Sequence, residues 1–183
     1  MLTINFSPFP NLETDRLTLR SVTVNDVNEI FDLRSNKEVM KYIPRPIAKT
    51  LDDALDHINT INAMIDKNEG INWGISFRGS PKLIGIIGHY RIQPHNHRAE
   101  VGYILNPEFH GQGIIPEAMK KVIAYGFNEM KLHSIEAVIN PKNNASERVL
   151  QKSGFKKEAH FIENHLYEGE FLDTVIYSLL NNS

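Results

Sequence analysis

The sequence of 183 residues contains no cysteine. This absence excludes disulfide bonds, thiolate metal ligands and a cysteine nucleophile from this chain. The sequence also has no uninterrupted apolar run of about 18 residues, the length a membrane-spanning helix needs. Its first ten residues lack the basic stretch and apolar core of a signal peptide. We therefore expect a cytoplasmic protein that does not associate with a membrane.

Charge of either sign is not in excess. Twenty Lys and Arg residues stand against 22 Asp and Glu residues, for a formal net charge of −2. Such a balance argues against a protein dedicated to nucleic acids or anionic membranes. The hydrophobic content of 41% and the charged content of 23% are those of a folded globular chain. Because this length suits one ordinary domain, we expect a single domain over residues 1–183.

Two capping boxes predict the first helices. Thr23-x-x-Asp26 precedes a helix that would bury Val27, Ile30 and Phe31, and Thr50-x-x-Asp53 precedes a longer one. The longer helix has apolar residues at three- and four-residue spacing, namely Leu51, Leu55, Ile58, Ile61 and Ile65. Gly70 follows the polar end of this helix and is predicted to stop it.

The rest of the chain mixes strands with helices. An alternating strand is predicted over 16–20, and a hairpin over 73–77 and 83–92, with Gly79-Ser80-Pro81 as its turn. Further strands are predicted over 99–105, 135–139, 155–161 and 173–180, and further helices over 116–131 and 145–152, the latter closing at Gly154. This order indicates an α+β protein.

The segment from Leu105 to Ala118 carries a pattern suited to anion binding. A strand ends, Gly111 and Gly113 follow two residues apart, and a helix begins with Pro116 near its first turn. Glycines let the backbone approach a ligand closely, and the unpaired amides of a helix start attract a phosphate. The segment lacks the Gly-Lys-Ser/Thr of a Walker loop and the third glycine of a dinucleotide fingerprint. From these residues alone, a simple nucleotide-phosphate binder also remains open.

Several ordered motifs resemble a known family. They are Leu12–Arg20, Leu83–Gly88, Ala99–Tyr103, the glycine loop, Asn143–Phe155 and Asp173–Leu180. Together they resemble the Gcn5-related N-acetyltransferase superfamily, and within it the RimJ/RimL-type group of ribosomal-protein N-terminal acetyltransferases. The resemblance runs from about residue 12 to residue 180. It implies a mixed, mostly antiparallel central sheet with splayed central strands and helices on both faces.

The resemblance also implies an acetyl-CoA site between the splayed strands. The strand 99–105 would offer backbone hydrogen bonds to the pantetheine arm, and the amides of the glycine loop would hold the pyrophosphate. The cofactor-binding residues implied are Tyr103, Ile104, Leu105, His110, Gly111, Gln112, Gly113, Ile114, Ile115, Asn143 and Ser146. His110 and Ile115 depart from the family pattern, which usually has Gln or Arg and Gly or Ala there. We interpret Ile115 as a change in local packing.

Two residues are candidates for the chemistry. Glu100 lies in an apolar strand where an acid needs a reason, and the resemblance makes it the base near the acceptor amine. The alternative is a solvent-facing residue paired with Arg98. Ser146 matches the family serine near the CoA sulfur and would protonate the thiolate, although Asn143 and Ser146 also suit a helix cap. Tyr103 is a second possible proton donor, or a packing aromatic of the sheet.

The chemistry of the acceptor favours an α-amine. A free α-amino group has a pKa near 8, so roughly a tenth is neutral at pH 7, whereas a lysine-type amine is neutral about once in a few thousand molecules. We therefore predict direct acetyl transfer from acetyl-CoA to a protein N-terminal α-amine. A polyamine-like small amine, or a non-catalytic acyl-CoA-binding module, remains an alternative.

Three further expectations concern partners. The loops 41–46 and 93–98 are candidates for the mouth of the acceptor site, by their position in the family. His95-x-His97 has no third ligand at a telling spacing, so no metal is predicted. The final strand and an exposed hairpin offer pairing surfaces for a second copy, so a homo-oligomer is possible. No nucleic acid is expected as a partner.

Overall fold

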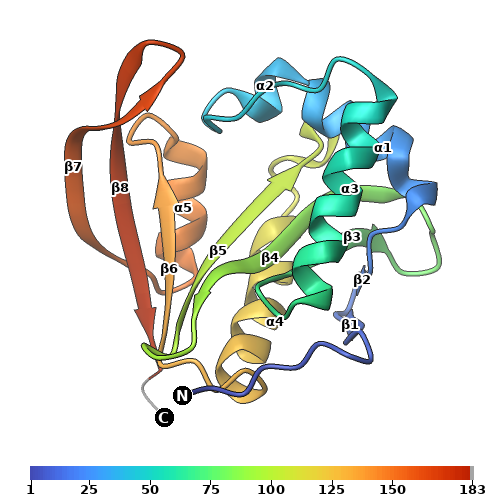
Figure 1. Ribbon diagram of the computed structural model, residues 1–183, viewed down its shortest axis with the longest axis horizontal. Coiled ribbons are helices and arrows are strands. Elements are labelled where there is room, and N and C mark those ends of the chain that lie inside the picture. The colour runs from blue at the N-terminus through green and yellow to red at the C-terminus, as the bar shows by residue number, and fades with distance from the viewer. Residues whose placement is uncertain (182–183) are drawn as a thin grey trace.

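The computed structural model describes residues 1–181 and shows one eight-stranded sheet in the order β1-β2-β3-β4-β5-β6-β8-β7 (Figure 1). The strands are β1 Leu12–Glu13, β2 Leu17–Arg20, β3 Ile71–Phe77, β4 Leu83–Gln93, β5 Arg98–Leu105, β6 Ser134–Ile139, β7 Lys156–Tyr167 and β8 Glu170–Leu180. Among these residues every neighbouring pair is antiparallel except β5 with β6. The predicted mixed, mostly antiparallel sheet is confirmed.

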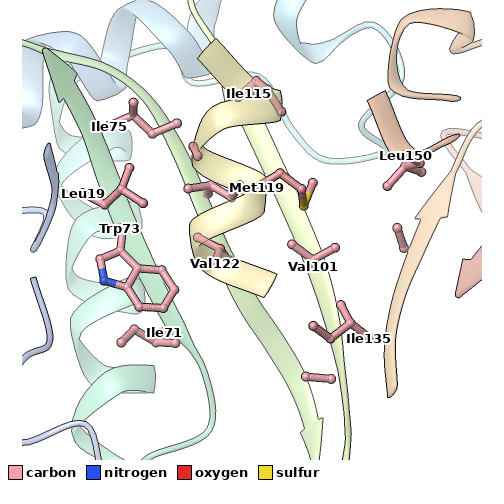
Figure 2. Close-up of a cluster of buried hydrophobic side chains, with 14 of the residues drawn as sticks. Leu19, Ile71, Trp73, Ile75, Val101, Ile115, Met119, Val122, Ile135 and Leu150 are labelled. Atoms are coloured by element: carbon pink, nitrogen blue, oxygen red, sulfur yellow. The ribbon is translucent and has the colours of Figure 1, made fainter. Parts of the chain in front are cut away.

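Helices cover both faces of the sheet, as predicted. They are α1 Val27–Ser35, α2 Lys37–Met40, α3 Leu51–Asp66, α4 Ile114–Asn128 and α5 Asn144–Lys152, with short 3-10 turns at Val24–Asp26 and Pro107–Phe109. Residues of α1 and α3 share a buried cluster with Val22, Leu83 and Ile86. Residues of α4 and α5 belong to a second cluster on the opposite face, where α4 lies across the strands (Figures 1 and 2).

The larger cluster fixes α4 against the centre of the sheet. Met119 and Val122 of α4 are fully buried, as is Trp73 of β3 (Figure 2). The Trp73 ring meets Tyr125 edge-on at a centroid distance of 5.2 Å, and its Nε1 donates to the carbonyl of Pro10. This burial holds the start of α4, and the glycine loop before it, at a fixed place beside β5.

The predicted helix starts are confirmed, but the buried faces differ in detail. Both capping boxes are present, and α1 buries Ile30 and Leu33 while Val27 and Phe31 are half-buried. In α3 the buried residues are Ala54, Ile58 and Ile61, whereas Leu51 is 47% exposed. Positions 54, 58 and 61 lie on one side of a helix, and the small Ala54 completes that side.

The predicted role of Gly70 is wrong. Asn68, not Gly70, takes the left-handed conformation after α3, with φ +56°, and its Oδ1 accepts from the amide of Phe6. Asn adopts this conformation more readily than most residues with a side chain. Gly70 instead packs closely, since a Cβ there would lie 3.0 Å from the His89 carbonyl and 2.5 Å from Sδ of the flexible Met64 side chain.

The splay between the central strands is confirmed. β5 and β6 pair only from Arg98 to Glu100 against Ser134 to Glu136, and beyond Glu100 the two strands diverge (Figure 1). From Val101 to Leu105, β5 therefore has a sheet neighbour on one side only. The opening of this V-shaped gap faces the end of the molecule where α2 and the β7–β8 turn lie.

The C-terminal hairpin differs from expectation in one respect. β8 lies between β6 and β7, so the final strand has both edges paired and cannot add a second copy there. The outer edge belongs to β7, which is longer than predicted. Across residues 1–181, no helix is both long and apolar enough to cross a bilayer.

Candidate active site

A cavity of about 750 Å³ occupies the gap beyond the last β5–β6 pair. On the sheet side it is lined by Glu100, Tyr103 and Ile104 of β5, and on the α5 side by Asn143 and Ser146. The structure therefore brings both predicted catalytic residues to one cavity. The facing strand, β6, contributes residues such as Ala137 and Ile139 to the cavity wall.

The other walls come from elements distant in sequence. The α1–α3 region contributes Arg34, residues 42–45 and His57, and the β7–β8 hairpin contributes residues such as His165 and Asp173. The middle four residues of the loop 41–46 therefore line this cavity, and the role of the loop at the acceptor mouth stays a prediction. The loop 93–98 does not line this cavity. It lies at the closed end of the V, where the His97 carbonyl accepts from the amides of His133 and Ser134.

Glu100 is buried at the bottom of the gap, with 4% of its surface exposed. Oε1 accepts from the Tyr90 hydroxyl at 2.9 Å, and Oε2 pairs with Nη1 of Arg91 at 2.8 Å. Burial raises the pKa of the Glu100 carboxyl, while the charge of Arg91 and the two hydrogen bonds oppose the rise. The alternative pairing with Arg98 is wrong, because Arg98 pairs with Glu136 on β6.

Tyr90 and Arg91 are functional candidates that the sequence analysis missed. Tyr90 is the register partner of Glu100, and the pairing shifts between Tyr90 and Gln93, where Arg91 takes φ +48°. This irregularity turns Arg91 toward Glu100. Gly102 makes room for the Tyr90 ring, since a Cβ there would lie 2.5 Å from the Tyr90 hydroxyl. An alternating pattern of polar and apolar residues does not reveal a bulge. The contact of Arg91 with Glu100 is therefore seen only in the pairing of β4 with β5.

Replacing Tyr90 by Phe is expected to shift the pH dependence of activity. The hydroxyl stabilises the ionised form of Glu100, so its loss raises the pKa of that carboxyl further. A base must be deprotonated, so the acidic limb of the kcat/KM profile moves to higher pH. Tyr125→Phe is the control, because it removes a phenol hydroxyl from a residue that packs against Trp73 in the larger buried cluster. Coincident acidic limbs for Tyr90→Phe and the parent protein would contradict this coupling.

Ser146 lies in the first turn of α5, and Asn143 is the N-cap of that helix. The Asn143 side chain accepts from the Ser146 amide at 3.1 Å, so the capping interpretation is confirmed for Asn143. The Ser146 hydroxyl has no partner within residues 1–181 and lines the cavity. The Tyr103 hydroxyl lies 3.5 Å from the Ser146 carbonyl, and burial raises the pKa of Tyr103 to about 12. Both hydroxyls can act as proton donors to the same region.

The glycine loop has the backbone that an anion site requires. Gly111 and Gly113 have φ values of +73° and +76°, which side-chain-bearing residues rarely adopt, and Gly113 is the N-cap of α4. The amides of residues 111–115 donate to no group within residues 1–181. These free amides at the positive end of a 15-residue helix fit a pyrophosphate.

A brace from the bend between β1 and β2 holds this loop. Arg16 pairs with Glu117 of α4 at 2.7 Å and donates through Nη1 to the Gln112 carbonyl at 3.1 Å. The Thr14 hydroxyl donates to the other oxygen of Glu117. No local pattern in the sequence reveals this brace, because about a hundred residues separate the partners. Gln112, one of the predicted cofactor-binding residues, thus stabilises the loop with its carbonyl, which accepts from Arg16, and with its side chain, which donates to the Glu108 carbonyl.

The free edge of β5 faces the gap. The Asn106 amide donates to Ile84 of β4, and antiparallel partners alternate, so the main-chain groups of Val101, Tyr103 and Leu105 point away from β4. This arrangement fits the expected pantetheine contacts, apart from the Leu105 carbonyl. Nε2 of His110 lies 3.1 Å from that oxygen, so this chain itself occupies one of the expected acceptors.

The two departures from the family pattern have different structural consequences. Ile115 is 6% exposed and packs in the core beside Met119, so its bulk points away from the loop (Figure 2). Ile114 is likewise buried, and both residues contribute amides rather than side chains to the loop. The His110 side chain instead forms a hydrogen bond with the Leu105 carbonyl. In the part of the chain that the structure describes, no group of three His, Asp or Glu side chains is placed to hold a metal ion.

Comparison with known proteins agrees with this geometry. The family model of the acetyltransferase (GNAT) domain matches residues 16–156. The uncharacterized N-acetyltransferase YoaA of Bacillus subtilis is 39% identical over 94% of this chain and 97% of its own length. A spermidine N(1)-acetyltransferase of Vibrio cholerae is 25% identical over 86% of this chain and 89% of its own.

A solved structure has the same fold. The GNAT-family acetyltransferase from Bacillus anthracis superposes with a TM-score of 0.84 at 29% identity, covering 93% of this chain and 98% of that one. Acetyl-CoA is the acetyl donor of this class of enzymes, and the loop and the β5 edge fit it. The chain therefore belongs to the GNAT family of acetyltransferases, the Gcn5-related superfamily that its sequence motifs predict.

Proposed function

We propose that this acetyltransferase transfers the acetyl group directly from acetyl-CoA to a protein N-terminal α-amine, with Glu100 as the base. The observation that carries the proposal is the placement of Glu100. It is a buried carboxylate in the cavity, beside the free edge of β5 and held by Tyr90 and Arg91. Its raised pKa makes it a better proton acceptor than an exposed glutamate.

The residues of this chain divide the proton transfers between them. Glu100 accepts, directly or through water, the proton that the amine nitrogen loses as it attacks the thioester carbonyl. The carbon–sulfur bond breaks, and the departing sulfur takes a proton from the Ser146 hydroxyl, which in turn regains one from solvent water. The loop amides and the β5 edge hold the donor, so the chain needs no covalent acyl-enzyme. This route agrees with the absence of cysteine.

The charge of the cavity favours an α-amine over a polyamine. Three guanidinium groups, of Arg34, Arg45 and Arg91, line it against two carboxylates, of Glu100 and Asp173. A polycation would meet net repulsion there. An α-amine carries at most one charge and is partly neutral near pH 7. The resemblance of the sequence to the RimJ/RimL-type group supports the same acceptor class.

A substrate panel tests this proposal. Peptides with free N-termini, the same peptides with blocked N-termini, and spermidine are incubated with acetyl-CoA, and released thiol is measured. We expect thiol release only with free N-terminal peptides. Release with spermidine alone would favour the polyamine alternative, which the Vibrio cholerae relative suggests. Acetyl-CoA binding in calorimetry without release on any acceptor would indicate the non-catalytic module.

Ser146→Ala is expected to lower kcat about tenfold with little change in acetyl-CoA affinity. The thiolate is a weak base compared with an alkoxide, so its protonation contributes less than general acids usually do. The cap survives because it uses the Ser146 amide. Calorimetric affinity and steady-state kcat are measured together. A larger loss in Tyr103→Phe than in Ser146→Ala would transfer the acid role to Tyr103.

A further inference from the structure

Two arginines of the cavity have no acidic partner. Arg34 lies in the last turn of α1, and its guanidinium donates to Sδ of Met40 at 3.7 Å and to the Pro46 carbonyl at 3.4 Å, and interacts electrostatically with Tyr167. Arg45 lies in the segment after α2. Within residues 1–181, neither guanidinium forms an ion pair with a carboxylate. Both line the cavity that holds Glu100.

The other charged groups of the cavity are already paired. Arg91 is held by Glu100, and Asp173 is held by His160 at 2.8 Å. Burial lowers the pKa of Arg34, and the charge of Arg45 lowers it further. Burial and the same two arginines lower the pKa of His57 to about 4, so His57 is neutral at pH 7. The wall formed by α1, α3 and the segment after α2 is therefore cationic and uncompensated.

Arg34 is half-buried and Arg45 is exposed, and their like charges repel, so an anion between them would be attracted by both. Arginine forks bind carboxylates with two parallel hydrogen bonds. The charge-bearing acceptor must enter this same cavity, because Glu100 lies in it. The anion that would relieve the repulsion can thus belong to the acceptor itself.

We propose that Arg34 and Arg45 form an anion subsite for the acceptor, and that the acceptor is a protein N-terminus with an acidic side chain in its first few residues. This inference rests on the proposed function for the position of the amine. An extended chain advances about 3.3 to 3.6 Å per residue, so the backbone of the second or third position lies roughly 3.5 to 7 Å beyond that of the first, and an acidic side chain there reaches further. A cavity of 750 Å³ accommodates such a segment.

The test uses three peptides that differ only at positions two and three, with Asp and Glu, with Asn and Gln, or with two Lys residues. The parent protein is expected to have a kcat/KM at least about tenfold higher for the acidic peptide than for its amide counterpart, the size of one charge-assisted hydrogen bond. Arg45→Gln should remove most of this preference. Arg45 is exposed, so its replacement leaves the core intact.

Lys156→Gln is the matched control, since it removes one positive charge from an exposed residue outside the cavity. It should keep the acidic preference. Binding of the three peptides is also measured by calorimetry without acetyl-CoA. Equal kcat/KM for the acidic and amide peptides, or a preference that Arg45→Gln leaves intact, would overturn the subsite while the proposed function stands.

The calorimetric binding measurement distinguishes the anion subsite from the proposed acetyltransferase function. If no peptide is acetylated but the acidic peptide binds, and Arg45→Gln weakens that binding, the subsite is supported and the proposed acetylation of peptides is wrong. If the acidic peptide neither reacts nor binds, the subsite is rejected. A preference for the lysine peptide would also reject it, because the cationic wall could not produce that order.

Discussion

Glu100→Gln is expected to lower kcat by about a hundredfold to a thousandfold at pH 7, the usual contribution of a general base. Glutamine keeps the shape of the side chain and can accept the hydrogen bond from Tyr90, but it cannot take the proton of the amine. The loss should be greater for a lysine-type amine than for an α-amine, because the former is almost wholly protonated. Steady-state kinetics on both acceptors measure the difference.

The stability of Glu100→Gln separates this loss from unfolding. The folded protein raises the pKa of Glu100, so between its ordinary value and the raised value the folded state binds more protons than the unfolded state. Stability from this group therefore falls as pH rises through that window, and the ionised carboxylate is unfavourable above it. Removing the charge should leave Tm at pH 7 unchanged or higher. An inactive variant with a lowered Tm would not support the base assignment.

Glu136→Gln is the matched control for this substitution. Glu136 is the register partner of Glu100 on β6, pairs with the half-buried Arg98, and does not line the cavity. Its replacement leaves Arg98 without a charged partner, so stability should fall while kcat stays close to that of the parent protein. Glu100→Gln is thus expected to lose activity without losing stability, and Glu136→Gln to lose stability without losing activity. Equal kcat in Glu100→Gln and Glu136→Gln would reject Glu100 as the base.

Gly88→Ala is expected to destabilise the protein by about 3 kcal/mol, which corresponds to a decrease in Tm of roughly 6 to 12 °C. Gly88 lies in the middle of β4, and a Cβ there would overlap the backbone carbonyl of Ile71 and lie 2.5 Å from Oδ1 of Asn72. Backbone of the neighbouring strand β3 cannot move aside as a flexible side chain can. Thermal unfolding followed by circular dichroism measures the change.

Gly79→Ala provides the comparison for Gly88→Ala. Gly79 has φ +78° but nothing lies within 4 Å of an added Cβ, so only the backbone conformation is penalised. Its expected cost is about 1 kcal/mol. If Gly88→Ala were no more destabilising than Gly79→Ala, the close approach of β3 and β4 at Gly88 would not limit stability.

Local sequence signals predicted much of the fold correctly. The capping boxes at Thr23 and Thr50, the hairpin of β3 and β4 and the end of α5 at Gly154 all depend on contacts between residues close in the chain. Such contacts leave a pattern in the sequence, because a cap, a turn or an amphipathic face needs particular residues at fixed spacing. Errors arose where packing chose among similar residues, as with Leu51 and Ala54.

The family membership, the glycine loop and the presence of Glu100 and Ser146 can all be read from the sequence alone. The surroundings of these residues depend on the folded arrangement. Tyr90 and Arg91 reach Glu100 through a bulge, and Arg16 reaches the glycine loop from the bend between β1 and β2, about a hundred residues earlier. Arg34 and Arg45 become a cationic wall only when α1 and the segment after α2 fold over the gap. Register and packing between distant segments follow from the whole core, so no local pattern encodes them.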